Sequence, residues 1–125
     1  NDYLQLLIGK LVANLPIQSE LEIDAELMLP IEKGQALGLI LNELISNSIK
    51  HAKPENGLEI KLKITQENGE VEVFYQDNGA GVNQENPGKN SLGMTLVDSF
   101  ITRQLNGKYK LNTIGNYSIK IIFGK

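Results

Sequence analysis

Hydrophobic residues recur along this chain with two different periods. Near the N-terminus they fall three or four positions apart, as in a helix with one buried face, at Leu4, Leu7, Ile8, Leu11, Val12 and Leu15. The same period follows Pro30 and Gly34 and continues to about Ala52. A third such segment begins at Ser91, which can cap a helix, and ends at Gly107. Its expected inward face consists of Leu92, Leu96, Val97, Phe100, Ile101 and Leu105. The pattern predicts three amphipathic helices.

Other segments alternate between hydrophobic and polar residues, as strands with one buried face do. They are residues 20–25, 58–65, 71–75, 108–112 and 118–123. Asn68-Gly69 predicts a tight turn, and a second turn is expected around Gly115. Strands buried on both faces are continuously apolar, so one face of this sheet should meet solvent. Three helices can cover the other face, which predicts a two-layer α+β sandwich.

Composition narrows the class of protein. At 125 residues the chain has the size of one domain, and its 41% hydrophobic and 22% charged residues are ordinary for a soluble fold. A net charge of -3 disfavours nucleic acid binding, and no apolar run is long enough to cross a membrane. The chain has no Cys and one His, which excludes disulfides and disfavours a structural zinc site. Because it begins Asn1-Asp2-Tyr3 without Met, we expect a module of a longer protein.

The stretch NELISNSIKHA, residues 42–52, carries polar residues that a structural helix does not need. Each helical residue advances by about 100°. One stripe of roughly 100° therefore holds the four polar residues Glu43, Asn47, Lys50 and His51. The hydrophobic residues are expected on the opposite arc, at Leu37, Leu41, Leu44, Ile45, Ile49 and Ala52.

Two interpretations of this polar stripe are open. It is either an ordinary solvated face, or a site in which the Asn47 amide oxygen binds Mg²⁺ and Lys50 meets phosphate. Asn is a poor helix former, which favours a functional reason for it. His51 has an equally simple alternative role, an interaction with the negative end of the helix dipole.

The stretch DNGAGV, residues 77–82, follows a predicted strand. Asn-Gly there could form a hairpin, but residues 83–87 provide no apolar strand to pair with. Gly79 and Gly81 instead allow the backbone to approach a ligand closely. Because the Asp77 carboxylate only accepts hydrogen bonds, it suits an amino group such as that of adenine. Gly93, in the first turn of a helix, suits phosphate, although such a glycine often serves packing alone.

Together, in this order, the three motifs resemble the nucleotide-binding domain of the GHKL ATPase superfamily. LGLILNELISNSIKHA, and SLGMTLV followed by QLNGKYKL, most resemble the catalytic ATP-binding domain of bacterial sensor histidine kinases, in a subfamily with a short lid at residues 83–90. The resemblance covers nearly all of residues 1–125. It implies a Bergerat-type ATP-binding fold, with a five-stranded mixed sheet covered on one face by three helices and ATP held between the long helix and the lid.

The resemblance also implies roles for individual residues. Asn47 is similar to the family's Mg²⁺ ligand, Glu43 to a residue that orients or deprotonates the attacking imidazole, and Asp77 to the adenine-binding aspartate. The remaining expected ATP contacts are Lys50, His51, Gly79, Gly81, Val82, Leu92, Gly93 and Met94.

Two features depart from the family pattern. Asn116-Tyr117 stands where the family often has Gly-Thr, so the threonine hydroxyl expected near the adenine aspartate is missing. Ser118 is the nearest alternative hydroxyl. The lid also lacks the longer glycine-rich run of many sensor kinases.

The resemblance implies a module that binds Mg-ATP and donates the γ-phosphate to a histidine on a separate upstream dimerisation domain, because the chain's one His lies inside the nucleotide motif. Residues 1–15 are then the helix that leads in from that domain. The expected parent protein is a cytoplasmic homodimer, soluble or membrane-anchored, that signals to a response regulator. This domain itself would contact neither nucleic acid nor membrane. Two alternatives remain, a serine kinase of the anti-sigma-factor type and a nucleotide-binding module without catalysis.

Overall fold

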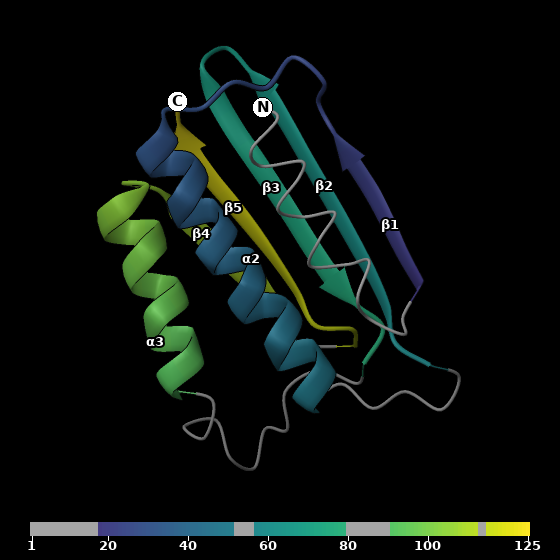
Figure 1. The fold of residues 1–125 in the computed structure, drawn as a ribbon. Helices are drawn as coiled ribbons and strands as arrows, with labels where there is room; N and C mark the ends of the chain where they lie inside the picture. Colours follow the sequence, from purple (N-terminus) through teal and green to yellow (C-terminus); the bar gives the residue numbers. More distant parts are fainter. Residues whose placement is uncertain (1–17, 52–56, 80–90, 113–114) are drawn as a thin grey trace.

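The computed structural model describes residues 18–51, 57–79, 91–112 and 115–125 (Figure 1). The helix expected before residue 16, and the lid at residues 83–90, lie outside the described residues. The described elements are β1 (Gln18–Ile23), α2 (Ile31–His51), β2 (Glu59–Glu67), β3 (Glu70–Asp77), α3 (Ser91–Ser99) with its π-helical continuation η1 (Phe100–Gln104), β4 (Lys108–Asn112) and β5 (Ser118–Gly124). No helix in the described part of the chain is both long and apolar enough to span a bilayer.

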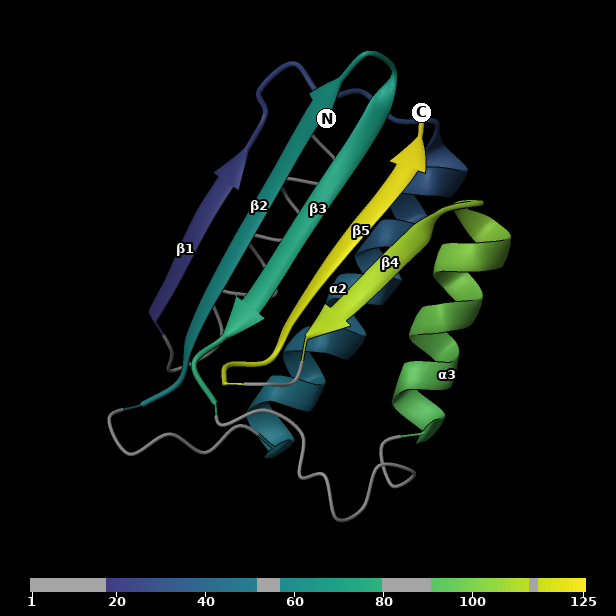
Figure 2. The same ribbon diagram turned by 180° about the vertical axis from the view of Figure 1, so that it is seen from behind.

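The five strands form one mixed sheet in the order β1-β2-β3-β5-β4. β1 pairs with β2 in parallel, and the other neighbouring strands are antiparallel. α2 and α3 lie on one face of the sheet (Figure 1), and no described element covers the other face, which Figure 2 shows from behind. The predicted two-layer α+β sandwich is confirmed.

The uncovered face is polar, as the alternating strand pattern predicted. β2 alternates exposed and buried residues from Glu59 to Ile64, and β3 alternates from Glu70 to Asp77. Three exposed ion pairs join neighbouring strands on this face: Lys61–Glu20 at 3.7 Å, Lys63–Glu22 at 3.8 Å and Lys120–Glu72 at 3.5 Å. Such exposed pairs contribute little stability, so they mark the solvent side of the sheet and do not hold it together.

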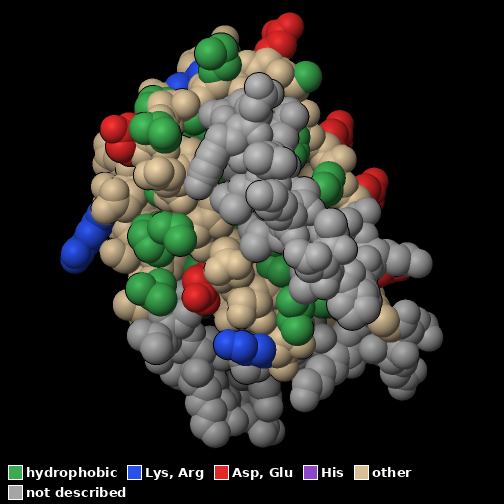
Figure 3. All heavy atoms as spheres, viewed as in Figure 1, with side chains coloured by type: hydrophobic (Ala, Val, Ile, Leu, Met, Phe, Trp, Pro, Cys, Tyr) green, Lys and Arg blue, Asp and Glu red, His purple; other side chains and the backbone are tan. Residues whose placement is uncertain are grey.

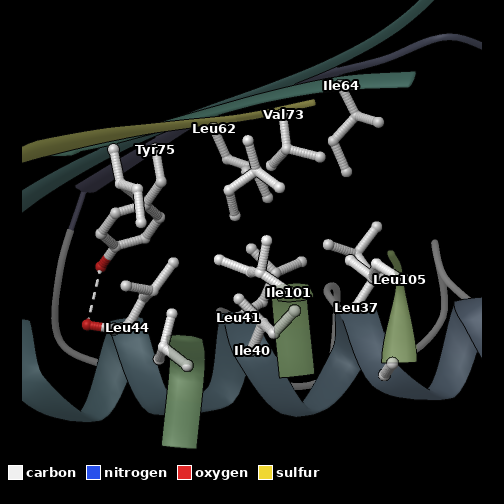
Figure 4. Close-up of a cluster of buried hydrophobic side chains, with 14 of the residues drawn as sticks. Leu37, Ile40, Leu41, Leu44, Leu62, Ile64, Val73, Tyr75, Ile101 and Leu105 are labelled. Carbon is white, nitrogen blue, oxygen red and sulfur yellow. Dashed lines mark hydrogen bonds between the residues drawn. The ribbon is translucent and has the colours of Figure 1, made fainter. Parts of the chain in front are cut away.

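The core lies between the sheet and the helices (Figure 4). In that close-up, hydrophobic side chains of α2 face those of β2 and β3, with two residues of the third helical segment beside them. The labelled buried side chains are Leu37, Ile40, Leu41, Leu44, Leu62, Ile64, Val73, Tyr75, Ile101 and Leu105. Burial of these side chains fixes α2 and the end of β3 relative to each other, which is what positions the site described below.

The first strand and the start of α2 differ from the sequence prediction. β1 ends at Ile23, because Asp24 Oδ1 accepts a hydrogen bond from Glu26 N at 2.9 Å and turns the chain. Ala25 therefore lies in a turn. Gly34 lies inside α2, and its N–H donates to the Pro30 carbonyl at 3.0 Å, so the helix starts before the glycine.

The third helical segment ends where it was expected to end, but the residue with the left-handed backbone is Asn106 and not Gly107. Asn106 adopts a left-handed conformation with φ of 53°, while the Gly107 N–H donates to the Ile101 carbonyl at 2.8 Å. Gly107 is needed for close packing instead, because a Cβ there would lie 2.7 Å from the Ile122 carbonyl oxygen. Leu96, expected on the inward face, is 41% exposed, whereas Val97 and Ile101 are buried.

Candidate functional site

Asp77, the last residue of β3, is a carboxylate buried on the helix side of the sheet. Its position follows from strand alternation, since Val71, Val73 and Tyr75 are buried on the same side. Only 4% of Asp77 is exposed. Its Oδ2 accepts a hydrogen bond from Ser48 Oγ at 2.7 Å, and its Oδ1 accepts one from Gly79 N at 2.9 Å. The carboxylate is therefore held from α2 on one side and from the following loop on the other.

Ser48 connects this carboxylate to a buried tyrosine. Its Oγ lies 2.7 Å from the Tyr75 hydroxyl, which also donates to the Leu44 carbonyl at 3.2 Å (Figure 4). Since a carboxylate only accepts, the Ser48 hydrogen goes to Asp77, and the Tyr75 hydrogen is shared between Ser48 and Leu44. Burial, together with the nearby Asp77 charge, raises the pKa of Tyr75 despite the opposing Ser48 hydrogen bond.

Asn78 ties the start of the loop to β2. Its N–H donates to the Glu59 carbonyl at 3.1 Å, and its Oδ1 accepts from Glu59 N at 2.8 Å. Its Nδ2 also donates to the Gly57 carbonyl at 3.0 Å. β3 is already paired with β2 and β5, so the hairpin interpretation of Asn78-Gly79 is wrong. The chain leaves the sheet here, and Asp77 marks its edge.

The polar stripe of α2 lies beside its buried face. Glu43 and Asn47 are half-buried and Lys50 is exposed, while the side chain of His51, which ends α2, is outside the described residues.

The buried face of α2 overlaps this stripe. Ala36 and Ile40, which share the stripe's angular range, are buried. Ile49, expected in the core, is 45% exposed, and Ala52 is not among the described residues. The expected opposite arcs were therefore wrong, because the buried face of α2 is centred closer to the stripe.

Three chain segments come together at one end of the molecule. In Figure 1, α2 ends, α3 begins and β3 ends at the same end of the sandwich. Figure 3 shows charged side chains of both signs scattered over this helix-side face, with polar and hydrophobic atoms between them. A buried carboxylate at an end where two helix termini meet is suited to hold a polar ligand.

A protein-family model confirms the resemblance to the GHKL ATPases. The model described as Histidine kinase-, DNA gyrase B-, and HSP90-like ATPase matches residues 32–122, more than half of the chain. The chain belongs to this ATPase family. The match runs from the first turn of α2 to β5 and so includes every described residue of the site.

Solved histidine kinases have the same fold as this ATPase domain. The histidine kinase domain of the Erythrobacter litoralis EL346 blue-light activated histidine kinase gives a TM-score of 0.79 at 19% identity, over 98% of this chain and 59% of that chain. Acinetobacter baumannii histidine kinase AdeS gives 0.72 at 16% identity, over 98% and 61%. The catalytic domain of histidine kinase ThkA gives 0.71 at 18% identity, over 99% and 90%.

The ATPase domain is only part of some of these proteins. It spans 59% of the Erythrobacter kinase-domain structure and 41% of a longer structure of the same kinase. No curated protein matches the chain.

The structure locates some of the predicted site residues and leaves others undescribed. Gly79 is buried, and its N–H donates to the Asp77 carboxylate. Met94 is partly buried in α3. Leu92 and Gly93 lie in the first turn of α3 without described surroundings, and Gly81 and Val82 lie outside the described residues. Ser48 was not predicted, although a small polar residue on a buried helix arc signals a required hydrogen-bond partner.

Tyr117, where the resemblance led us to expect a threonine, lies next to Asp77. Its carbonyl accepts the Asp77 N–H at 3.0 Å, and its hydroxyl donates to Met94 Sδ at 3.3 Å. Ser118, the alternative hydroxyl, alternates with the core residue Ile119, so it belongs to the other face of the sheet and cannot substitute.

A hollow of about 310 Å³ lies at the same end of the sheet. Its lining combines exposed residues of the uncovered face, among them Glu20 and Lys61, with the buried residues Ile60 and Asp77. The hollow therefore adjoins the candidate site at Asp77, whose carboxylate meets Ser48 of α2 on the helix side.

Tyrosine titration should lower the stability of this domain at alkaline pH. Burial, the charge of Asp77 and then Tyr109 raise the pKa of Tyr117 from 10.0 to about 12. A group whose pKa is higher in the folded state than in the unfolded state contributes its full stabilisation at pH values below its unfolded pKa. The contribution of Tyr117 is therefore lost as the pH rises from about 10 towards 12. Urea unfolding at pH 8 to 12 should show a falling free energy of unfolding. Tyr117→Phe should weaken that slope, and an unchanged slope would contradict the assignment.

Proposed function

We propose that this domain binds ATP and serves as the ATP-binding catalytic part of a histidine kinase. The observation that carries the proposal is the Asp77 carboxylate, buried on the helix side and held by Ser48 and Gly79 at the end of the sandwich. Membership of the ATPase family supports the same conclusion.

The Asp77 carboxylate suits the adenine base. Its two oxygens offer about four acceptor positions, and the described donors Ser48 and Gly79 occupy two of them. An exocyclic amino group such as that of adenine can use a remaining position. Guanine would present a carbonyl oxygen at the same point, which an anion repels. Burial strengthens this discrimination, because a buried charge interacts in a lower effective dielectric than water.

The phosphates are assigned to the end of α2 and the start of α3. Asn47 immediately precedes Ser48, so its side chain lies within one turn of the residue that holds Asp77. Lys50 and His51 follow it, and the proposed contacts are completed by Gly81 and Val82 of the DNGAGV stretch and by Leu92, Gly93 and Met94 of α3.

The α2 residues also fit a divalent cation. Asn47 offers an amide oxygen and Glu43 a carboxylate oxygen one turn away, both half-buried, and such hard oxygen donors suit Mg²⁺ alongside phosphate oxygens. When bound, Mg²⁺ neutralises charge on the transferring phosphate. We assign Asn47 to holding the ion, and Glu43 to orienting the acceptor imidazole or accepting its proton.

The phosphate acceptor is proposed to be a histidine of another domain. The only His in this chain, His51, belongs to α2 and to the proposed nucleotide site. Transfer then depends on positioning the acceptor in line with the terminal phosphate. A dimeric, cytoplasmic parent protein that passes the phosphate to a response regulator follows from the same proposal, and the acceptor domain would precede β1.

Asn47→Ala should remove most of the Mg²⁺ dependence of ATP binding. Calorimetric titration of a non-hydrolysable ATP analogue, with Mg²⁺ and with EDTA, measures this dependence. Loss of one of the few protein ligands should abolish most of the gain that Mg²⁺ gives the wild-type domain. Asn42→Ala, at an exposed position of the same helix, is the matched control and should keep the full dependence. An Asn47→Ala domain with wild-type Mg²⁺ dependence would exclude the metal assignment.

A further inference from the structure

Tyr117 provides a second polar group on the helix side of the sheet, beside Asp77. The hydrogen bond from Asp77 N to the Tyr117 carbonyl, 3.0 Å long, joins the end of β3 to the residue before β5. Tyr117 has the same alternation as Ile119 and Ile121, and it packs against the edge of the core. The two side chains therefore share one face of the sheet at one end of the molecule.

The Tyr117 hydroxyl has a poor hydrogen-bond partner. It donates to Met94 Sδ at 3.3 Å, and a thioether sulfur is a weak acceptor. A tyrosine hydroxyl is protonated at neutral pH and can therefore donate. The other hydroxyls on this face have better partners, because Ser48 donates to the Asp77 carboxylate and Tyr75 has Ser48 and the Leu44 carbonyl. Among the described residues here, Tyr117 is thus the donor that gains most from a better acceptor.

Asp77 and Tyr117 together present an acceptor and a donor. The adenine ring has the complementary pair, because its amino group is flanked by ring nitrogens that accept hydrogen bonds. Guanine has a carbonyl oxygen in place of the amino group and an N–H in place of one of these nitrogens. A site whose hydroxyl donates to the nitrogen that guanine replaces by an N–H would therefore reject guanine twice, whereas Asp77 alone rejects it once.

We propose that Tyr117 determines base specificity, with its hydroxyl leaving Met94 Sδ to donate to a ring nitrogen beside the amino group that Asp77 accepts. This proposal rests on the proposed function, in which Asp77 binds the base. It assigns to Tyr117 a direct contact with the nucleotide, and to Met94 the role of holding the hydroxyl when no base is bound.

Titration of Tyr117→Phe with ATP and with two analogues, 1-deaza-ATP and 7-deaza-ATP, tests this contact. Each analogue lacks one ring nitrogen beside the amino group. Wild-type protein should bind one of them about threefold to tenfold more weakly than ATP, the range for one neutral hydrogen bond. Tyr117→Phe should bind ATP more weakly by the same factor and should no longer distinguish ATP from that analogue.

Tyr109→Phe is the matched control, because it removes a tyrosine hydroxyl that donates to Asp98 Oδ1 at 2.8 Å and already has this strong acceptor. It should leave affinity and discrimination unchanged. Wild-type affinity in Tyr117→Phe, tighter binding there, or an equal loss for ATP and both analogues would overturn the proposal. Asp77→Asn, titrated in parallel, separates the two levels. If Asp77→Asn loses ATP binding while Tyr117→Phe keeps it, the proposed function stands and only the Tyr117 contact fails. If the folded wild type binds no ATP, both the proposed function and the Tyr117 contact fail.

Discussion

Replacing Asp77 by asparagine should weaken ATP binding by roughly tenfold to a hundredfold. A hydrogen bond to a charged group contributes about 1.5 to 3 kcal/mol, and the asparagine amide has one neutral acceptor where the carboxylate has two charged ones. That acceptor is already needed by Gly79 N, which donates to Asp77 Oδ1 at 2.9 Å. The asparagine NH₂ would then face the adenine amino group, donor against donor. Calorimetric titration with a non-hydrolysable ATP analogue measures the loss.

The substitution should leave the fold intact. Asparagine has nearly the volume of aspartate, and the Ser48 hydroxyl can rotate to accept from the new NH₂ group. Asp98→Asn offers a matched control, since it neutralises another carboxylate that accepts a tyrosine hydroxyl, in α3. It should bind ATP as the wild type does. If Asp77→Asn unfolds at the wild-type urea midpoint and still binds ATP with unchanged affinity, the adenine contact is assigned to the wrong residue.

Replacing Ser48 by alanine should destabilise the domain by about 2 to 3 kcal/mol. The change removes the hydroxyl that donates to Asp77 Oδ2 and leaves one oxygen of a buried carboxylate without that donor. Tyr75 keeps the Leu44 carbonyl as a partner, so the loss falls mainly on Asp77. The carboxylate would also lose its support from α2, and ATP affinity should fall with stability. Urea unfolding measures the first effect and calorimetry the second.

Ser46→Ala is the control for this experiment. Ser46 lies half-buried on the same helix, two residues before Ser48, and a change there should alter the free energy of unfolding by no more than about 0.5 kcal/mol. Equal, small effects of the two alanine substitutions would show that the Ser48–Asp77 hydrogen bond contributes little.

The fold could be predicted because its hydrophobic periods are local. Alternation in β2 and β3 gave buried positions such as Ile60, Val73 and Tyr75 directly, since each strand has one face against the helices. The helical period predicted an end of α2 at about Ala52, close to the observed end at His51. Pairing was not local, so the strand order β1-β2-β3-β5-β4 came only from the structure.

The errors on the helices have one physical cause. A helical wheel says which residues lie together but not how the helix is rotated against its neighbours. Ile49 and Leu96 were assigned inward on hydrophobicity, yet both are exposed, while the polar Ser48 is buried. Rotation of the helix, set by packing, decided these positions.

The candidate site was predictable only in part. Asp77 and Gly79 were predicted from a strand end followed by glycines, but their mutual hydrogen bond came from the structure. Ser48 and the hydroxyl of Tyr117 required the structure, since each meets a partner more than twenty residues away in sequence. The roles of all these residues in nucleotide binding, and those of Glu43, Asn47, Lys50 and His51, remain predictions.

Base selectivity tests the proposed ATP-binding function most directly. The wild-type domain should be titrated calorimetrically with non-hydrolysable analogues of ATP and of GTP, each with Mg²⁺, under conditions where urea unfolding confirms that it is folded. The buried Asp77 acceptor predicts binding of the ATP analogue and at least roughly tenfold weaker binding of the GTP analogue. A folded domain that binds neither nucleotide, or binds both equally well, would contradict the proposal.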